Sequence, residues 1–142
     1  MSGMVPFDEE GQEKLTRAIK GFSIYLLSGG AAFSVEIMVF ILKGWEEGVR
    51  WWLTTFPLFS IWLLAPFSIL SYLILKGRNS FRQLVLLFFG AVGTTFFALF
   101  IFLDAFFIHY DPRSWIVLLI VPGYQFVAIG SLAALRYAIR DK

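Results

Sequence analysis

Four long apolar runs are the feature that most constrains this chain. They extend over residues 21–42, 53–75, 84–103 and 115–135. The first run contains one charged residue, Glu36, and the other three contain none. Because the hydrocarbon core of a bilayer is about 30 Å thick, a helix of about 20 apolar residues spans it. The pattern therefore predicts four transmembrane helices.

Composition excludes the other classes of protein. The chain has 142 residues, of which 58% are hydrophobic and 15% are charged. A soluble domain of about this size hides only about 70% of the surface that its unfolded chain exposes, which leaves too much apolar surface in water. A membrane β-barrel would show alternating rather than continuous apolar runs. We therefore expect an all-α integral membrane protein, with residues 1–142 forming a single membrane domain that contains a four-helix bundle.

The segment over residues 8–20 precedes the first run and has a helical pattern of its own. Asp8 is a suitable N-cap, acidic residues follow it, and Lys14 and Arg17 lie toward the other end, as the helix dipole favours. This pattern predicts a short amphipathic helix lying on the membrane surface. A helix that docks on a partner is the alternative. The predicted spans are 21–42, 53–75, 84–108 and 112–135.

The basic residues give the bundle an orientation. Nine lie in the N-terminal segment, the 76–83 loop and the C-terminal end. The other two loops contain only three, namely Lys43, Arg50 and Arg113. Since basic loops stay in the cytoplasm, both termini are predicted to be cytoplasmic, in a bacterial inner (plasma) membrane. An aromatic belt at the opposite boundary supports this orientation, and it consists of Trp45, Trp51, Trp52, Tyr110 and Trp115.

Polar residues near the outer ends of the predicted spans form a candidate site. Ionisable groups within a membrane cost about 2.5–3.5 kcal/mol on insertion scales, so each one needs an explanation. Asp111 followed by Pro112 predicts the start of the fourth helix, close to the end of the third. A polar path from the outer surface to the membrane centre is then expected. The candidate residues are Glu36, Asp104, His109, Asp111, Tyr124 and Gln125.

Several interpretations of this cluster stay open. The residues could cap helices and pair with one another, they could form a proton or cation site, or Tyr124 and Gln125 could bind a ligand or lipid. A metal-dependent enzyme site is disfavoured because the chain contains one His and no Cys. We accordingly predict no catalytic residue, no metal site and no cofactor.

Small residues recur in the first, third and fourth spans, where they allow helices to approach closely. The predicted contact faces contain Gly29, Gly30, Gly90, Gly93, Gly123 and Gly130. These faces could pack within the bundle, or one of them could bind a partner or a second copy of the chain.

The sequence favours a non-enzymatic function for this small polytopic protein. We expect non-covalent binding within the bilayer, as an accessory or inhibitory partner of another membrane protein or as an immunity protein against a membrane-inserting toxin. The alternative is a proton- or cation-coupled small transporter or channel subunit that uses the outer polar cluster. The expected partners are membrane lipids and another membrane protein or a second copy. Nucleic acid is not expected, because 12 basic and 10 acidic residues nearly balance.

Overall fold

The protein is an all-α bundle in a computed structural model that describes residues 8–140, with only the backbone of residue 140. The helices are α1 (Glu9–Ile41), α2 (Val49–Lys76), α3 (Phe81–Leu103) and α4 (Val117–Arg140). A π-helical turn, η1 (Asp104–Ile108), extends α3, and a 3-10 turn, η2 (Ser114–Ile116), precedes α4. Within the described residues no strand is present, and four helical segments are long and apolar enough to cross a membrane. The predicted all-α four-helix bundle is confirmed.

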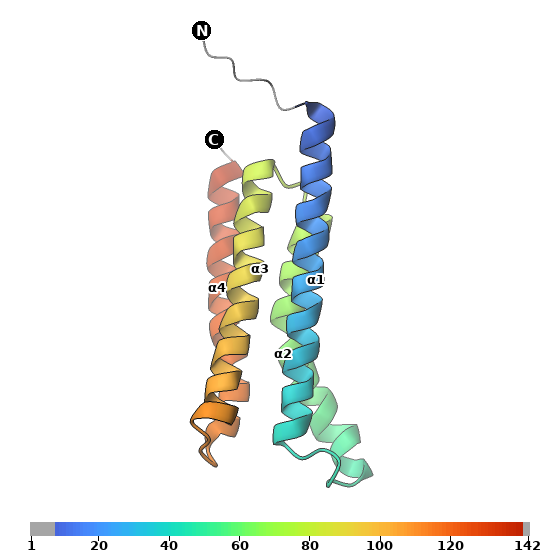
Figure 1. Ribbon diagram of the computed structural model, residues 1–142, viewed down its shortest axis with the longest axis vertical. Helices are drawn as coiled ribbons and strands as arrows, with labels where there is room; N and C mark the ends of the chain where they lie inside the picture. Colours follow the sequence, from blue (N-terminus) through green and yellow to red (C-terminus); the bar gives the residue numbers. More distant parts are fainter. Residues whose placement is uncertain (1–7, 141–142) are drawn as a thin grey trace.

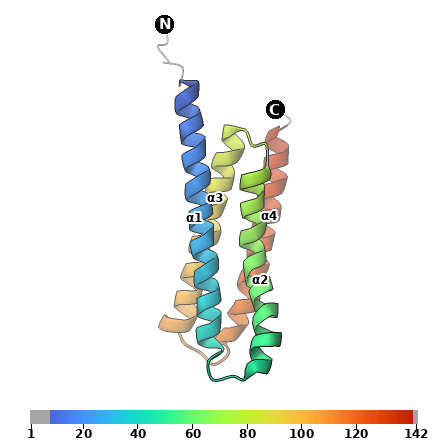
Figure 2. The same cartoon turned by 90° about the vertical axis from the view of Figure 1, so that its right-hand side faces the viewer.

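The four helices run side by side (Figures 1 and 2). Helix α1 packs against α2 and α3, and α4 packs against the same two helices, so α1 and α4 lie diagonally across the bundle. The N-terminal and C-terminal ends of the described chain lie at one end, together with the α2–α3 turn (Figure 1). The α1–α2 and α3–α4 connections lie at the other. This arrangement agrees with the predicted grouping of the loops, whereas the assignment of one end to the cytoplasm stays a prediction.

The interior combines large aliphatic side chains with close helix contacts. Leu27, Met38, Leu70 and Leu87 are fully buried. At Gly30, a Cβ atom would lie 2.9 Å from both the Phe67 ring and the Thr95 methyl group. Glycine at this position therefore lets α1 approach α2 and α3 closely, as small residues do in membrane bundles.

Many phenylalanines of the third span face away from this interior. Phe89, Phe96 and Phe100 are more than half exposed, whereas Phe102 is buried. An outward-facing phenylalanine is unfavourable in water and favourable in lipid. The aromatic excess of the chain therefore covers the membrane-facing surface as well as the core.

The prediction of a separate interfacial helix over residues 8–20 is wrong. These residues form the first turns of α1, which continues without a break into the membrane span and extends beyond the other helices (Figure 1). No proline or polar turn follows Lys20, and the single Gly21 costs only about 1 kcal/mol in a helix. Asp8 is the N-cap residue, but its side chain forms no capping hydrogen bond. The predicted pairs Glu10–Lys14 and Glu13–Arg17 are formed, at 2.7 and 2.9 Å.

The fourth helix begins later than the sequence indicates. Residues 112 and 113 form a turn, and the 3-10 turn η2 starts only at Ser114. The Asp111 carboxylate accepts a hydrogen bond from the Arg113 backbone N–H at 2.7 Å, while the Ser114 hydroxyl accepts one from the Asp111 N–H at 3.2 Å. Short-range bonds of this kind satisfy the backbone in a tight turn, so α-helical winding is delayed.

Candidate functional site

Asp104 and His109 are brought together by the π-helical turn at the end of α3 that leads into the α3–α4 connection. The His109 N–H bonds to the Asp104 carbonyl oxygen at 2.8 Å, which places residues five positions apart above one another. The His109 Nδ1 atom donates to Asp104 Oδ1 at 2.9 Å. Both side chains are substantially exposed at the end of the bundle. The predicted proximity is therefore observed, in a surface pair.

Asp111 lies at the same end of the bundle, in the turn that follows η1. Its carboxylate is exposed and bonds to the backbone of its own turn, as described above. Among the described residues no group of three or more His, Asp or Glu side chains is arranged to hold a metal ion. Asp111 therefore stabilises its own turn and does not cap the fourth helix as predicted, because the residue at the N-cap of η2 is Arg113.

Glu36 lies apart from these residues, on the outer surface of α1. It is exposed, and no hydrogen bond or ion pair joins it to any described residue. It lies five positions before Ile41, which places it about 7.5 Å from the end of α1 at the α1–α2 connection. Glu36 therefore presents a carboxylate to the surroundings of the bundle within the half of the predicted membrane span that is nearer to this connection.

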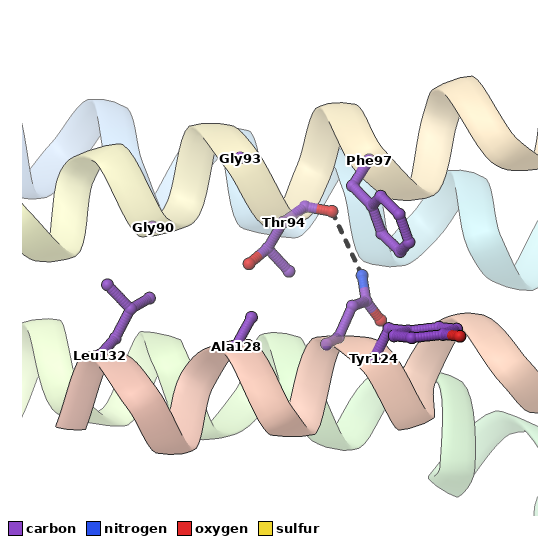
Figure 3. Close-up of a pocket in the computed structure, with 8 residues that line it drawn as sticks. Gly90, Gly93, Thr94, Phe97, Tyr124, Ala128 and Leu132 are labelled. Carbon is purple, nitrogen blue, oxygen red and sulfur yellow. Dashed lines mark hydrogen bonds between the residues drawn. The ribbon is translucent and has the colours of Figure 1, made fainter. Parts of the chain in front are cut away.

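Gln125 is enclosed between α3 and α4, and only 2% of its surface is exposed. Its Nε2 atom donates to the Thr94 carbonyl oxygen at 3.2 Å (Figure 3). This hydrogen bond links the two helices near the centre of the membrane, as buried polar side chains do in membrane bundles. A continuous path from Glu36 to Gln125 is not assembled, because Glu36 faces outward from α1 while Gln125 faces α3.

Tyr124 lies beside Gln125 but faces outward, with 63% of its surface exposed. Its ring meets the Phe97 ring edge-on, with the ring centres 6.4 Å apart. These two rings close one end of a groove between α3 and α4 (Figure 3).

The groove between α3 and α4 has a volume of about 330 Å³ and an almost wholly apolar surface. Gly90 and Gly93 line it on α3, and Ala128 and Leu132 line it on α4. A Cβ atom at Gly90 would collide with the Leu132 side chain, whereas one at Gly93 would meet nothing within 4 Å. The groove is therefore closely packed at Gly90 and open at Gly93.

The predicted glycine faces divide into two groups. Gly30 and Gly90 form close helix contacts inside the bundle. At the others, a Cβ atom would meet nothing within 4 Å, and they are Gly29, Gly93, Gly123 and Gly130. These open positions are available to lipid or to another helix. Gly29 is the one that shares an exposed side of α1 with Glu36.

A polar network at the end of the bundle that holds the α2–α3 turn was missed by the reasoning from sequence. The Arg136 Nε atom donates to Asn79 Oδ1 at 2.7 Å, and Gln83 Nε2 donates to the Arg136 carbonyl oxygen at 3.0 Å. Ser80 and Gln83 also form a capping box at the start of α3. The Ser-x-x-Gln spacing is a recognisable sign of that cap. The contact with Arg136, which is 57 residues from Asn79, has no local sign in the sequence.

Comparison with family models, with curated proteins and with solved structures finds no match to this chain.

Proposed function

We propose that this protein is a small, non-enzymatic inner-membrane protein that acts by binding a helix of another membrane protein within the bilayer. The outward-facing Glu36 carboxylate carries this proposal. An unpaired ionisable group in a span costs about 2.5–3.5 kcal/mol on insertion scales. A partner that supplies a cationic or hydrogen-bond-donating group at that depth would offset the cost.

The surroundings of Glu36 on α1 support a helix as the occupant. Ser28, Gly29 and Ala32 are exposed, and Ser28, Ala32 and Glu36 follow one another at four-residue spacing along one side of the helix. Small side chains allow a second backbone to approach closely, and a carboxylate one turn away would fix its register. We call Ser28, Gly29, Ala32 and Glu36 the α1 face.

Charge favours a different protein over a second copy as the partner. The apolar runs over 53–75, 84–103 and 115–135 contain no Lys or Arg, so a second copy brings no cation to membrane depth. A two-fold contact through α1 would bring two Glu36 carboxylates toward each other, since such an interface uses the same patch twice. The expected partner helix therefore carries Arg, Lys or a polar donor in its outer half.

This binding function has three specific forms: an accessory subunit, an inhibitory subunit, and an immunity protein that blocks a membrane-inserting toxin. In each form the α1 face engages one helix of the target. A partner subunit would be retained on purification, whereas an immunity function would protect cells from one toxin.

A proton- or cation-coupled transporter is the alternative, and it receives less support from the geometry. A transporter of this kind needs Glu36, Asp104, His109 and Gln125 along one conduit. Glu36 instead lies on the outward face of α1, and Asp104 and His109 lie at an exposed end of the bundle. Gln125 is buried in the contact between α3 and α4. Liposomes that contain the protein should show no proton or cation flux. A flux that Glu36→Gln and Asp104→Asn abolish would establish transport instead.

The decisive experiment is purification from the native membrane with site-specific photocrosslinking from position 32. We expect a single membrane protein to copurify in stoichiometric amount and to crosslink from Ala32 but not from Phe89, which is exposed on α3. Glu36→Leu should abolish copurification without loss of the fold, while Glu46→Gln in the outer loop should retain it. A monomer without partner or protective phenotype would contradict the proposal.

A further inference from the structure

A small pocket lies at the inner end of the bundle, where the α2–α3 turn meets α4. Its volume is about 180 Å³. Arg78, Gln83, Ala133, Arg136 and Tyr137 line it, and its surface is mainly polar, unlike that of the groove between α3 and α4. Two guanidinium-bearing side chains therefore share one pocket at the level where the spans end.

The Arg136 side chain is held in place by the turn. Its Nε atom donates to Asn79 Oδ1 at 2.7 Å, and Asn79 Nδ2 in turn donates to the Leu73 carbonyl oxygen at 2.9 Å. The Arg136 Nη2 atom lies so close to Gly77 that any Cβ there would collide with it. The guanidinium is thus oriented before any ligand arrives, and no hydrogen bond to a described residue engages its Nη atoms.

Neither arginine forms an ion pair with a described residue. The ion pairs among the described residues are Glu10–Lys14, Glu13–Arg17, Lys43–Glu46 and Asp104–His109. Arg78 is exposed and Arg136 is partly buried; two cations that line one pocket repel each other, and an anion between them would remove that repulsion. A planar guanidinium fits a phosphate group with two parallel hydrogen bonds.

The apolar groove lies on the same seam between α3 and α4, and the close contact of Gly90 with Leu132 stands between it and this pocket. On α4, Arg136, Leu132, Ala128 and Tyr124 recur every four residues, so they lie along one side of the helix. Figure 3 shows Leu132, Ala128 and Tyr124 in this row along the groove, with Tyr124 at its exposed end. On α3 the groove begins about 10 Å from Gln83 and extends to about 21 Å, so its nearer part lies within one leaflet of a 30 Å core and its farther part lies beyond the centre. A charged pocket at the membrane boundary therefore shares a seam with an apolar groove that begins in the same leaflet.

We propose that Arg78 and Arg136 bind the phosphate of an anionic phospholipid from the inner leaflet, with one acyl chain of that lipid in the α3–α4 groove. Basic pockets between transmembrane helices on the cytoplasmic side are suited to anionic headgroups. The groove favours a lipid over free phosphate, because free phosphate would leave it unused. This site is independent of the α1 face and of the partner proposed for it.

The test measures lipid retention by the purified full-length protein with native mass spectrometry. Phosphatidylglycerol is titrated against phosphatidylcholine, and inorganic phosphate is titrated alone in a parallel arm. We expect preferential retention of phosphatidylglycerol, which Arg78→Gln weakens about tenfold. Arg82→Gln is the matched control, because it removes the same charge from an exposed position at the same end without altering the pocket lining. It should leave retention unchanged.

Two further variants separate the parts of the site. Gly93→Leu fills the open part of the groove, so it should weaken phosphatidylglycerol retention while the Arg78 and Arg136 pocket stays intact. Asn79→Ala releases the Arg136 side chain and should also weaken retention. Equal losses in Arg78→Gln and Arg82→Gln, or equal retention of the two lipids, would overturn the proposal. The protein could also bind inorganic phosphate equally well with and without Gly93→Leu, and show no preference between the two lipids. That result would show that the pocket binds free phosphate and not a phospholipid.

Discussion

The Gln125 side chain joins α4 to α3 by donating from Nε2 to the Thr94 carbonyl oxygen at 3.2 Å (Figure 3). A carbonyl oxygen has two lone pairs, so this bond can be added to the backbone bond of the α3 helix. The bond therefore strengthens the contact between the helices without disrupting the secondary structure of either one. It also explains how an amide side chain is accommodated at the centre of an apolar bundle.

Gln125→Leu should lower the free energy of unfolding in mixed micelles by about 0.6 kcal/mol, and by no more than about 1.7 kcal/mol. The change removes one interhelical hydrogen bond but leaves no backbone carbonyl unpaired. Tyr124→Phe, at an exposed neighbouring position, is the control and should stay within about 0.5 kcal/mol of the wild type. A loss above about 3 kcal/mol would show that Gln125 supports more than this bond.

Gly30→Ala should destabilise the bundle by about 1–3 kcal/mol, because the new methyl group would press against Phe67 and Thr95. Gly29→Ala is the matched control on the same helix. Its methyl group would meet nothing within 4 Å, so the higher helix propensity of alanine should leave stability equal or slightly raised. Thermal unfolding of both variants in the same detergent is the measurement. Equal effects at the two positions would contradict the close contact at Gly30.

Lys43→Gly should stabilise the protein by about 1 kcal/mol. Lys43 follows the C-terminal end of α1 with φ of 51°, in the left-handed region that glycine adopts without steric cost. The exposed Lys43–Glu46 pair, at 3.7 Å, contributes little to stability. Lys43→Ala is the control, since it removes the charge but keeps the backbone strain. It should give no gain in the denaturant titration that compares the two variants.

A reporter that is active only in the cytoplasm should be active when it is fused after Lys142. A reporter that is active only outside should be active when it is inserted at Pro112 in the α3–α4 connection. The physical reason is the excess of basic residues at the end of the bundle that holds the termini. An external C-terminal tag would reverse the orientation, and it would place the Arg78 and Arg136 pocket in the outer leaflet.

The outer polar cluster shows the limit of reasoning along the chain. Asp104 and His109 could be placed together because they lie within two turns of one helix end, and they do form a pair. The position of Glu36 along its helix could be predicted, since it follows from residue number and helix rise. Its direction could not be derived, because the side of α1 that faces the bundle is set by contacts with α2 and α3.

The N-terminal part of α1 also shows what local sequence patterns can and cannot predict. The charge pattern of residues 8–20 indicated a helix correctly, because neighbouring ion pairs are local interactions. Whether that helix stops or continues depends on backbone conformation at Lys20 and Gly21, where the sequence has no strong breaker. Hydropathy indicates where the polar segment gives way to the apolar span, but it does not indicate whether the helix is interrupted at that point.

The sequence by itself determined that this chain spans a membrane four times as an all-α protein, because lipid requires long apolar helices with internally satisfied backbones. It also determined the grouping of the loops by charge. Tertiary structure alone decided that Gly30 and Gly90 pack inward, that Glu36 faces outward, and that Asn79 orients Arg136. In an apolar span every side of a helix is hydrophobic, so hydropathy cannot select the buried side, and the selection is made by the fit of side chains between neighbouring helices.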